Sequence, residues 1–350
     1  MVSLNQMAIV TGFLVVFFAN YWIGNHLSAS MITGEVTTET LSQWNTSEGW
    51  RFMFGLEIIP AALFFILLFL KRFWASVICV FICVLFSADI LLSCNHCKDS
   101  IIDELQIRNK IRLMTFNISY INPVTNFENI REMILSENPD VIQFQEISPK
   151  MLNEIKSLKS VFPYSTNLDK PLDRFDSVIL SKYPLKNIKV VNNYIVKTNV
   201  ILDETELTII GTHLPAPLPS RLINLYLDLE LKYTNATRTL PPSMLNLDAA
   251  IKLMQNLKTL ADNTNQNLII MGDLNMTPTS KRFTNFLKDT NLYTYVSYKH
   301  PTFTWPAFVP SFLGIQIDHV LFSKNFRMIG KKTTNHFGSD HRPLIVDLNY

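Results

Sequence analysis

The pattern of apolar and polar positions divides the chain near residue 100. Three long apolar runs, at 7–24, 52–70 and 73–93, come first, and a helix that crosses a bilayer needs about 20 apolar residues. The first 100 residues carry only ten charged side chains, whereas the rest of the chain carries 27 basic and 23 acidic ones. We therefore expect a membrane region over 1–97 with about three transmembrane helices. A cleaved signal peptide in place of the first run, and packed soluble helices, are the alternatives.

The orientation of this region follows from two positive charges. Lys71 and Arg72 lie between the second and third runs, in a connection too short to be more than a tight turn. Cytoplasmic loops carry an excess of Lys and Arg, so we expect this turn and the N-terminus in the cytoplasm. An odd number of spans then places the C-terminal domain outside. The prediction is a multi-pass protein of the cell (inner) membrane, with the lipid bilayer as one partner and its large domain on the extracytoplasmic side.

A polar joint over 98–110 leads to a second domain over 111–350, in which short apolar runs alternate with amphipathic stretches. The expected strands are 110–117, 141–145, 177–181, 188–197, 267–272, 317–323 and 344–348, with a hairpin from 200–202 to 207–212 across Asp203 and Glu204. The expected helices are 127–138, 150–161, 249–263 and 281–290. This alternation, with its hairpins, favours a layered α/β sandwich over a purely parallel sheet. The proline-punctuated stretch 215–242 is expected to be an inserted loop or a helical lid.

Polar residues stand where the apolar strand patterns end. They are Asn117, Glu146, His213, Asp273, Asn275, Asp340 and His341. Strand ends are where rigid scaffolds present catalytic side chains, and amides, imidazoles and carboxylates together can hold a hard divalent cation and activate a water molecule. All four cysteines precede residue 98, so nothing in the large domain suggests a zinc–thiolate site.

Seven short motifs carry a resemblance to a known family. In chain order they are TFN, QFQE, SVILSKYPL, GTH, GDLN, IDHVLFS and GSDHRPL. In this order they resemble the endonuclease/exonuclease/phosphatase superfamily over about 110–350, and TFTWP together with the N-terminal spans is most similar to its membrane-anchored bacterial branch. The resemblance implies a DNase I-like fold, a four-layer α/β sandwich of two packed mixed sheets flanked by helices. It also implies a metal-dependent phosphoric ester hydrolase.

The resemblance assigns metal and phosphate roles to the strand-end residues. Glu146 is implied to be the principal Mg²⁺ ligand, with Mn²⁺ as a substitute, and Asn117 lies beside that metal. Asp340 is implied to assist at the metal or at the phosphate. Asp273 is implied to contact the metal or to orient the attacking water, and Asn275 to donate to a phosphate oxygen of the substrate.

The resemblance also implies how the histidines act. His341 is the implied general base, for which an imidazole pKa near neutrality is suited, and Asp318 would hold its ring in the required tautomer. His213 would bind the substrate and stabilise the charge that develops on phosphate. Adjacent side chains on a strand point to opposite faces, so His319 is expected to face away from the site. His319, His336 and His300 are expected to be structural or surface residues.

The predicted function is a membrane-anchored, Mg²⁺-dependent phosphoesterase that cleaves phosphodiester bonds by attack of a His341-activated water. Nucleic acid is the default substrate, although the large domain's net charge of +4 is too weak to require it. A phospholipid or sphingolipid headgroup phosphodiesterase is the alternative, because tethering brings the site close to headgroups, and the apolar stretches 215–242 and 306–314 are expected to rim the cleft. An inactive member used for binding or signalling is the alternative of another class, against which the intact motif set argues. No protein partner is predicted.

Overall fold

The computed structural model describes residues 109–119, 127–166, 168, 177–192, 194–203, 205–215, 247–263, 267–278, 280–295, 302–307 and 314–350. The expected membrane region over 1–97, the joint up to residue 108, the stretch 216–242 and the loop 308–313 lie outside these residues. Within the described ranges, no helix is both long enough and apolar enough to cross a membrane. The chain divides into two compact units, and the larger one, formed by 92–215, 250–278 and 284–350, holds two β-sheets.

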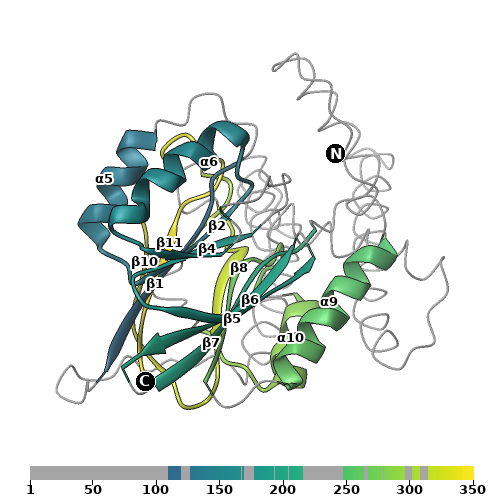
Figure 1. Ribbon diagram of the computed structural model, residues 1–350. Coiled ribbons are helices and arrows are strands. Elements are labelled where there is room, and N and C mark those ends of the chain that lie inside the picture. Colours follow the sequence, from purple (N-terminus) through teal and green to yellow (C-terminus); the bar gives the residue numbers. More distant parts are fainter. Residues whose placement is uncertain are drawn as a thin grey trace, which may run out of the picture. The chain divides into compact units, whose positions relative to one another are not determined.

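Two mixed sheets face each other in the larger unit (Figure 1). In spatial order the first contains β10 (Arg327–Thr333), β11 (Leu344–Asn349), β1 (Lys110–Asn117), β2 (Val141–Gln145), β4 (Val178–Ser181) and β3 (Tyr164–Ser165). The second contains β5 (Leu185–Asn192), β6 (Ile195–Leu202), β7 (Thr205–His213), β8 (Leu268–Asp273) and β9 (Asp318–Phe322). The pairs β1–β2 and β7–β8 run parallel, and the other named pairs run antiparallel.

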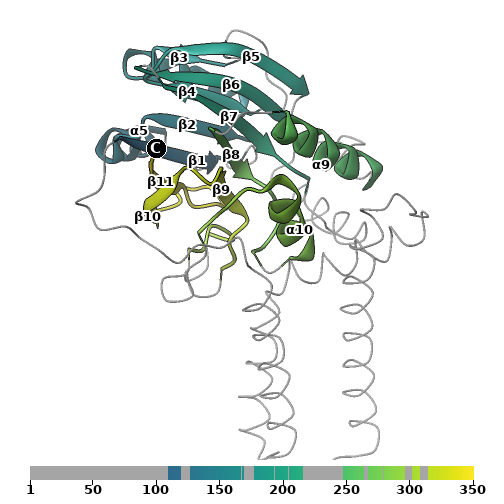
Figure 2. The same cartoon turned by 90° about the horizontal axis from the view of Figure 1, so that it is seen from below.

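Helices cover the outer faces of the sheets. The first sheet is covered by α5 (Phe127–Glu137) and α6 (Pro149–Lys156), and α6 continues into the short 3-10 helix η2 (Ser157–Ser160). The larger unit's parts of α9 (Leu247–Asp262) and α10 (Lys281–Thr290) lie on the far side of the second sheet (Figure 2). The Ser148 side chain caps α6 by accepting from Met151 N, and Pro149 occupies the first helical position. These layers confirm the predicted sandwich of two packed mixed sheets flanked by helices.

Strand alternation sends side chains into two separate cores. Along β1, Leu113 packs between the two sheets, while Phe116 packs on the opposite face against the core that α5 and α6 cover. The space between the sheets is apolar over most of its length. It becomes polar toward the ends of β1 and β2, where Thr115, Gln143 and Gln145 are fully buried. The sandwich therefore has an apolar end and a polar end.

The prediction of a single strand at 188–197 is wrong. The chain forms β5 and β6 there, two antiparallel strands between which it reverses from Asn192 to Ile195. Two consecutive asparagines at 192–193 favour a turn, but the apolar residues on either side concealed that signal. The hairpin expected across Asp203 is confirmed, because β6 and β7 pair with Leu202 opposite Thr205.

The sequence pattern does not predict β3 or β10. β3 has only two residues, too few to show a period. β10 carries Arg327, Lys331 and Lys332, and it lies at the edge of its sheet. Charged residues, lysine above all, are common on edge strands because they discourage pairing with other chains. The charges of β10 are therefore typical of its position.

Lys331 sends its ammonium group inward from this edge strand. Its Nζ donates to Tyr295 O at 3.0 Å and to Gln316 Oε1 at 2.8 Å, and so links β10 to segments beside the second sheet. Although the residue as a whole is only partly buried, burial of the ammonium lowers its pKa from 10.5 to about 7. The charge of this lysine is thus costly in the folded state.

We expect Lys331→Met to gain stability relative to the wild type as the pH is lowered. Between pH values of about 7 and 10.5, the unfolded state binds a proton at Lys331 that the folded state does not. The unfolding free energy of the wild type therefore falls as the pH drops through this window, and the methionine variant lacks this dependence. Urea denaturation of both proteins at about pH 9.5 and about pH 7 measures the difference. Identical pH dependence in the two proteins would contradict the burial of this ammonium.

Candidate active site

The strand ends bring polar side chains to one edge of the sandwich. Asn117 ends β1, Glu146 follows β2, His213 ends β7 and Asp273 ends β8. Because β1–β2 and β7–β8 are parallel pairs, the two ends within each pair lie at the same edge. Strand β9 is antiparallel to β8, so its first residue, Asp318, stands directly opposite Asp273.

Glu146 and Asp273 approach each other through two shared partners. Asn117 Nδ2 donates to Glu146 Oε1 at 3.3 Å and to Asp273 Oδ2 at 3.1 Å. His213 Nε2 lies 3.8 Å from Glu146 Oε1 and 3.7 Å from Asp273 Oδ2. Glu146 has a positive φ of 53° directly after its strand. Both sheets therefore contribute to one cluster of carboxylate, amide and imidazole groups.

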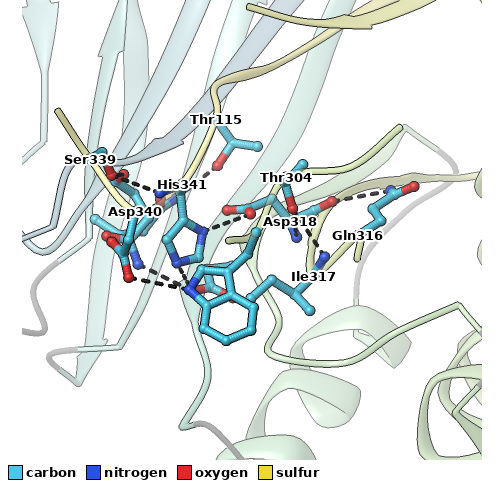
Figure 3. Close-up of polar contacts among 12 residues, drawn as sticks. Thr115, Thr304, Gln316, Ile317, Asp318, Ser339, Asp340 and His341 are labelled. Carbon is cyan, nitrogen blue, oxygen red and sulfur yellow. Dashed lines mark hydrogen bonds and ion pairs between the residues drawn. The ribbon is translucent and has the colours of Figure 1, made fainter. Parts of the chain in front are cut away.

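His341 and Asp318 form a buried imidazole–carboxylate pair (Figure 3). His341 Nδ1 lies 2.9 Å from Asp318 Oδ2, and His341 Nε2 lies 3.7 Å from Asp273 Oδ2. The backbone around Asp318 is held on both sides, since its N–H donates to Thr304 Oγ1 at 3.2 Å and its carbonyl accepts from Gln316 Nε2 at 3.1 Å. A proton on Nδ1 points at Asp318, which leaves Nε2 facing Asp273.

Burial and neighbouring charges shift the pKa values of Asp273 and His341. Burial raises the pKa of Asp273 to about 8, and the Asp318 carboxylate adds to the rise, while His341 and hydrogen bonds from Asn275 and Asn117 oppose it. Burial alone would lower the pKa of His341, but Asp318 and Asp273 outweigh it and raise this pKa to about 10. The carboxylates thus stabilise positive charge at this position.

Asn275 and Asp340 lie beside the cluster with their side chains engaged elsewhere. The Asn275 N–H donates to Asp273 Oδ1 at 2.9 Å, and its Nδ2 donates to Leu214 O at 2.6 Å. Asp340 Oδ2 accepts from Trp305 Nε1 at 3.2 Å (Figure 3). The phosphate role of Asn275 and the metal role of Asp340 therefore stay predictions.

His319 points away from the site, as strand alternation predicts. Its Nε2 donates to Met276 O at 2.7 Å, and its Nδ1 accepts from Gln316 Nε2 at 3.2 Å. Burial lowers the pKa of His319 to about 3, so the ring is neutral. These contacts give it a structural role next to Asp318.

Ser339 belongs to the site, although the sequence analysis does not single it out. Its Oγ donates to Asn117 O at 2.7 Å and accepts from the His341 N–H at 3.0 Å. The hydroxyl thereby ties the end of β1 to the loop that carries His341. The GSDH motif held the signal, because serine hydroxyls readily bond to backbone groups a few residues away.

The donor set suits a divalent cation. Glu146 and Asp273 bring carboxylate oxygen atoms to the same Asn117 amide, and Asp273, Asp318 and His341 each offer a ligand atom within 4.8 Å of the others. Oxygen donors are what hard cations prefer. Positive charge here would also offset the burial and the Asp318 carboxylate that together raise the pKa of Asp273.

The family of the chain follows from its match to known sequences. Residues 114–341 match the model of the Endonuclease/Exonuclease/phosphatase family, and this span contains every residue of the site described above. The chain belongs to the Endonuclease/Exonuclease/phosphatase family. Membership confirms the resemblance carried by the seven motifs.

Solved structures similar to this family member share little sequence with it. The endonuclease/exonuclease/phosphatase from Beutenbergia cavernae is 17% identical, with 69% of this chain and 72% of that chain covered and a TM-score of 0.48. A Staphylococcus aureus beta toxin variant with bound magnesium ions is 18% identical, with 68% and 99% covered and a TM-score of 0.46. Truncated TDP2 from Caenorhabditis elegans is 14% identical, with 69% and 98% covered and a TM-score of 0.47.

The N-terminal part of this family member is similar to a different class of protein. Residues 1–88 match the model of the Sugar (and other) transporter family. Over 69 residues the chain is 41% identical to the D-xylose-proton symporter of Escherichia coli (strain K12), which is 20% of this chain and 11% of the symporter. The chain thus spans about a tenth of the length of the curated relatives it matches. This similarity is in keeping with a membrane region in the part of the chain that the structure does not describe.

Proposed function

We propose that this protein is a membrane-anchored, Mg²⁺-dependent phosphodiesterase in which a water molecule attacks phosphorus. The observation that supports this most is the His341–Asp318 pair, in which the second ring nitrogen of His341, Nε2, lies 3.7 Å from Asp273 Oδ2. Asn117 Nδ2 donates both to Asp273 Oδ2 and to Glu146 Oε1. A base and a group of metal-binding oxygens converge on one place, as metal-assisted hydrolysis requires.

Glu146 is the principal metal ligand in this proposal, and Asn117 lies beside the ion. Asp340 assists with the carboxylate oxygen that does not accept from Trp305. Asp273 orients the attacking water or contacts the metal. Bound Mg²⁺, or Mn²⁺ in its place, supplies positive charge that offsets the negative charge of the phosphoryl oxygens.

His341 accepts the proton of the attacking water at Nε2, while Asp318 holds the Nδ1–H and thereby the tautomer. Only the neutral imidazole can act as a base. The pKa of about 10 that the carboxylates impose on His341 keeps the ring protonated near neutral pH, and this pKa falls when positive charge is placed at the same carboxylates. Metal loading and the readiness of the base are therefore coupled.

His213 and Asn275 stabilise the negative charge that develops on phosphate. His213 Nε2 already faces Glu146 and Asp273 at 3.8 and 3.7 Å. Asn275 Nδ2 donates to Leu214 O, so it has to exchange this bond for one to a phosphate oxygen. Preorganised donors of this kind are typically worth about 10²–10³-fold in rate.

Nucleic acid is the first substrate class of this proposal, because nucleases are named in the family to which residues 114–341 belong. A phospholipid or sphingolipid headgroup is the second. It is favoured by the similarity of residues 1–88 to a membrane transporter, since a membrane region would keep the site close to lipid headgroups. Both substrates present a phosphodiester, so the chemistry assigned to the site is the same for each.

The test of the function uses the full-length protein in detergent micelles with Mg²⁺. Plasmid DNA, RNA and mixed vesicles of phospholipid and sphingomyelin are incubated with it in parallel, with a chelator in a matched set. We expect cleavage of nucleic acid that the chelator abolishes. Cleavage of lipid alone would favour the headgroup phosphodiesterase, and no phosphodiester cleaved in any arm would overturn the proposal.

The membrane topology of the proposal has three spans within 1–97, a cytoplasmic N-terminus and an extracytoplasmic catalytic domain. Lys71 and Arg72 are the positive cluster that sets this orientation. A reporter that folds only in an oxidising compartment, fused after Tyr350, should therefore be active. Activity of a cytoplasm-only reporter at the same position would mean that the number of spans is even.

We expect Glu146→Gln to reduce turnover by at least about 100-fold while the protein stays folded, because the amide keeps the size of the side chain but loses the charge that holds a cation. Mg²⁺ titrations of the hydrolysis rate measure the effect. Glu154→Gln is the matched control, since Glu154 is an exposed carboxylate on α6. Equal rates in Glu146→Gln and the wild type would remove Glu146 from the metal site.

We expect His341→Ala to lower kcat by about 10²–10⁴-fold, the usual contribution of a general base. His319→Ala removes a buried imidazole from the position next to Asp318, where the side chain points away from the site. This variant should lower thermal stability but reduce kcat far less. Steady-state kinetics below the unfolding temperature of each variant compare the two. A His341→Ala enzyme within about threefold of the wild type would be incompatible with this base.

A further inference from the structure

A buried layer of polar side chains lies between the sheets, directly behind the candidate active site. We propose that Gln143 in this layer is a positioning residue, whose amide ties β2 to β7 and so fixes Glu146 relative to His213. The inference rests on the proposed function, because it concerns the metal ligand and the charge-stabilising imidazole of that site. Gln143 itself is fully buried, and it is neither the proposed metal ligand nor the charge-stabilising imidazole.

The amide of Gln143 is bonded on all sides. Its Nε2 donates to Thr212 O at 3.1 Å, across the sandwich, and to Ser177 Oγ at 2.6 Å within its own half. Its Oε1 accepts from Thr115 Oγ1 at 2.9 Å, and Thr115 Oγ1 accepts in turn from Gln145 Nε2 at 2.8 Å. A side chain held by three partners has one conformation, so the cross-sheet bond has a fixed length and direction.

Two glycines of the second sheet leave room for this side chain. A Cβ on Gly211 would meet Gln143 Cγ at 3.1 Å, closer than packed side chains normally come. A Cβ on Gly272 would meet Thr212 O at 1.8 Å and Gln143 Oε1 at 2.9 Å, and the φ of 144° at Gly272 also disfavours any other residue there. The second sheet thus has glycine, which carries no side chain, at two positions that face Gln143.

The bond acts on the site through short stretches of chain. Thr212, whose carbonyl accepts from Gln143, immediately precedes His213, and Glu146 follows Gln143 by three residues. The apolar core between the sheets resists separation but is non-directional, so it does not by itself set how the strand ends are aligned. A displacement of about 1 Å at a reacting group can cost about 10²-fold in rate. A directional bond next to both ends removes that freedom.

The test compares Gln143→Met with Ser177→Ala in the full-length protein. Methionine keeps the length of the side chain but removes the bond to Thr212 O, whereas Ser177→Ala removes one partner of the same amide and leaves that bond intact. We expect Gln143→Met to weaken Mn²⁺ binding in calorimetry by about 10-fold and to lower kcat by about 10–100-fold, the range seen when groups that orient metal ligands are lost. KM should change little, and Ser177→Ala should stay within about threefold of the wild type in both quantities.

Gln143→Asn is the second variant, because it keeps the amide but shortens its reach by one methylene, and it should bind Mn²⁺ as weakly as Gln143→Met. The position of the His213 ring resonances in metal-free ¹⁵N spectra is the readout that needs neither metal nor substrate. Wild-type Mn²⁺ affinity and unshifted His213 signals in both variants would overturn the inference, as would equal losses in Ser177→Ala. If the wild type binds Mn²⁺ but cleaves no phosphodiester, the proposed function fails while the binding comparison still decides the role of Gln143.

Discussion

Asp273 and Asp318 stand opposite each other on paired strands inside the protein, and two buried like charges at that spacing require compensation. The raised pKa of Asp273 shows the cost. His341 lies against both carboxylates, and Asn117 donates to Asp273. The register of β8 and β9 imposes this opposition, since a slip of one residue would send one carboxylate to the other face. The preference of the site for positive charge therefore follows from strand pairing, in a protein whose net charge is +2.

The interior of the sandwich divides its tasks along the strands. At the apolar end, residues such as Leu113 and Ile209 supply burial without demanding one alignment. At the polar end, buried amides and hydroxyls make directional bonds that the apolar contacts cannot replace. Buried polar groups are stabilising only when they are paired, so the layer around Gln143 must form as a unit. On each strand, the apolar residues that supply burial and the polar residues that align the site are thus only a few positions apart.

The sequence predicted the layers and the elements that build the site, because each site strand is an apolar run that ends in a polar residue. The convergence of Asn117, Glu146, His213 and Asp273 follows from those ends, and Asp318 joins them as the first residue of β9, which runs antiparallel to β8. The directions of Asn275 and Asp340 were not predictable in the same way, because both lie in loops, where no period tells which way a side chain turns. The end of β5 at Asn192 and the charged strand β10 were missed for another reason. In both segments the local composition favoured a different structure from the strand pairing that tertiary contacts impose.

The left-handed backbone of Glu146 has a consequence for how the strand pattern is read. Gln145 bonds to Thr115 between the sheets, so the next side chain should point to the helix-covered face with Phe144. Glu146 instead faces the second sheet, 3.8 Å from His213, because its φ of 53° ends the regular pleat there. One residue with a left-handed backbone thus shifts the alternation of side chains by one position. It lets two consecutive positions serve the same side of a sheet, and a strict alternation of side chains would assign Glu146 to the wrong face.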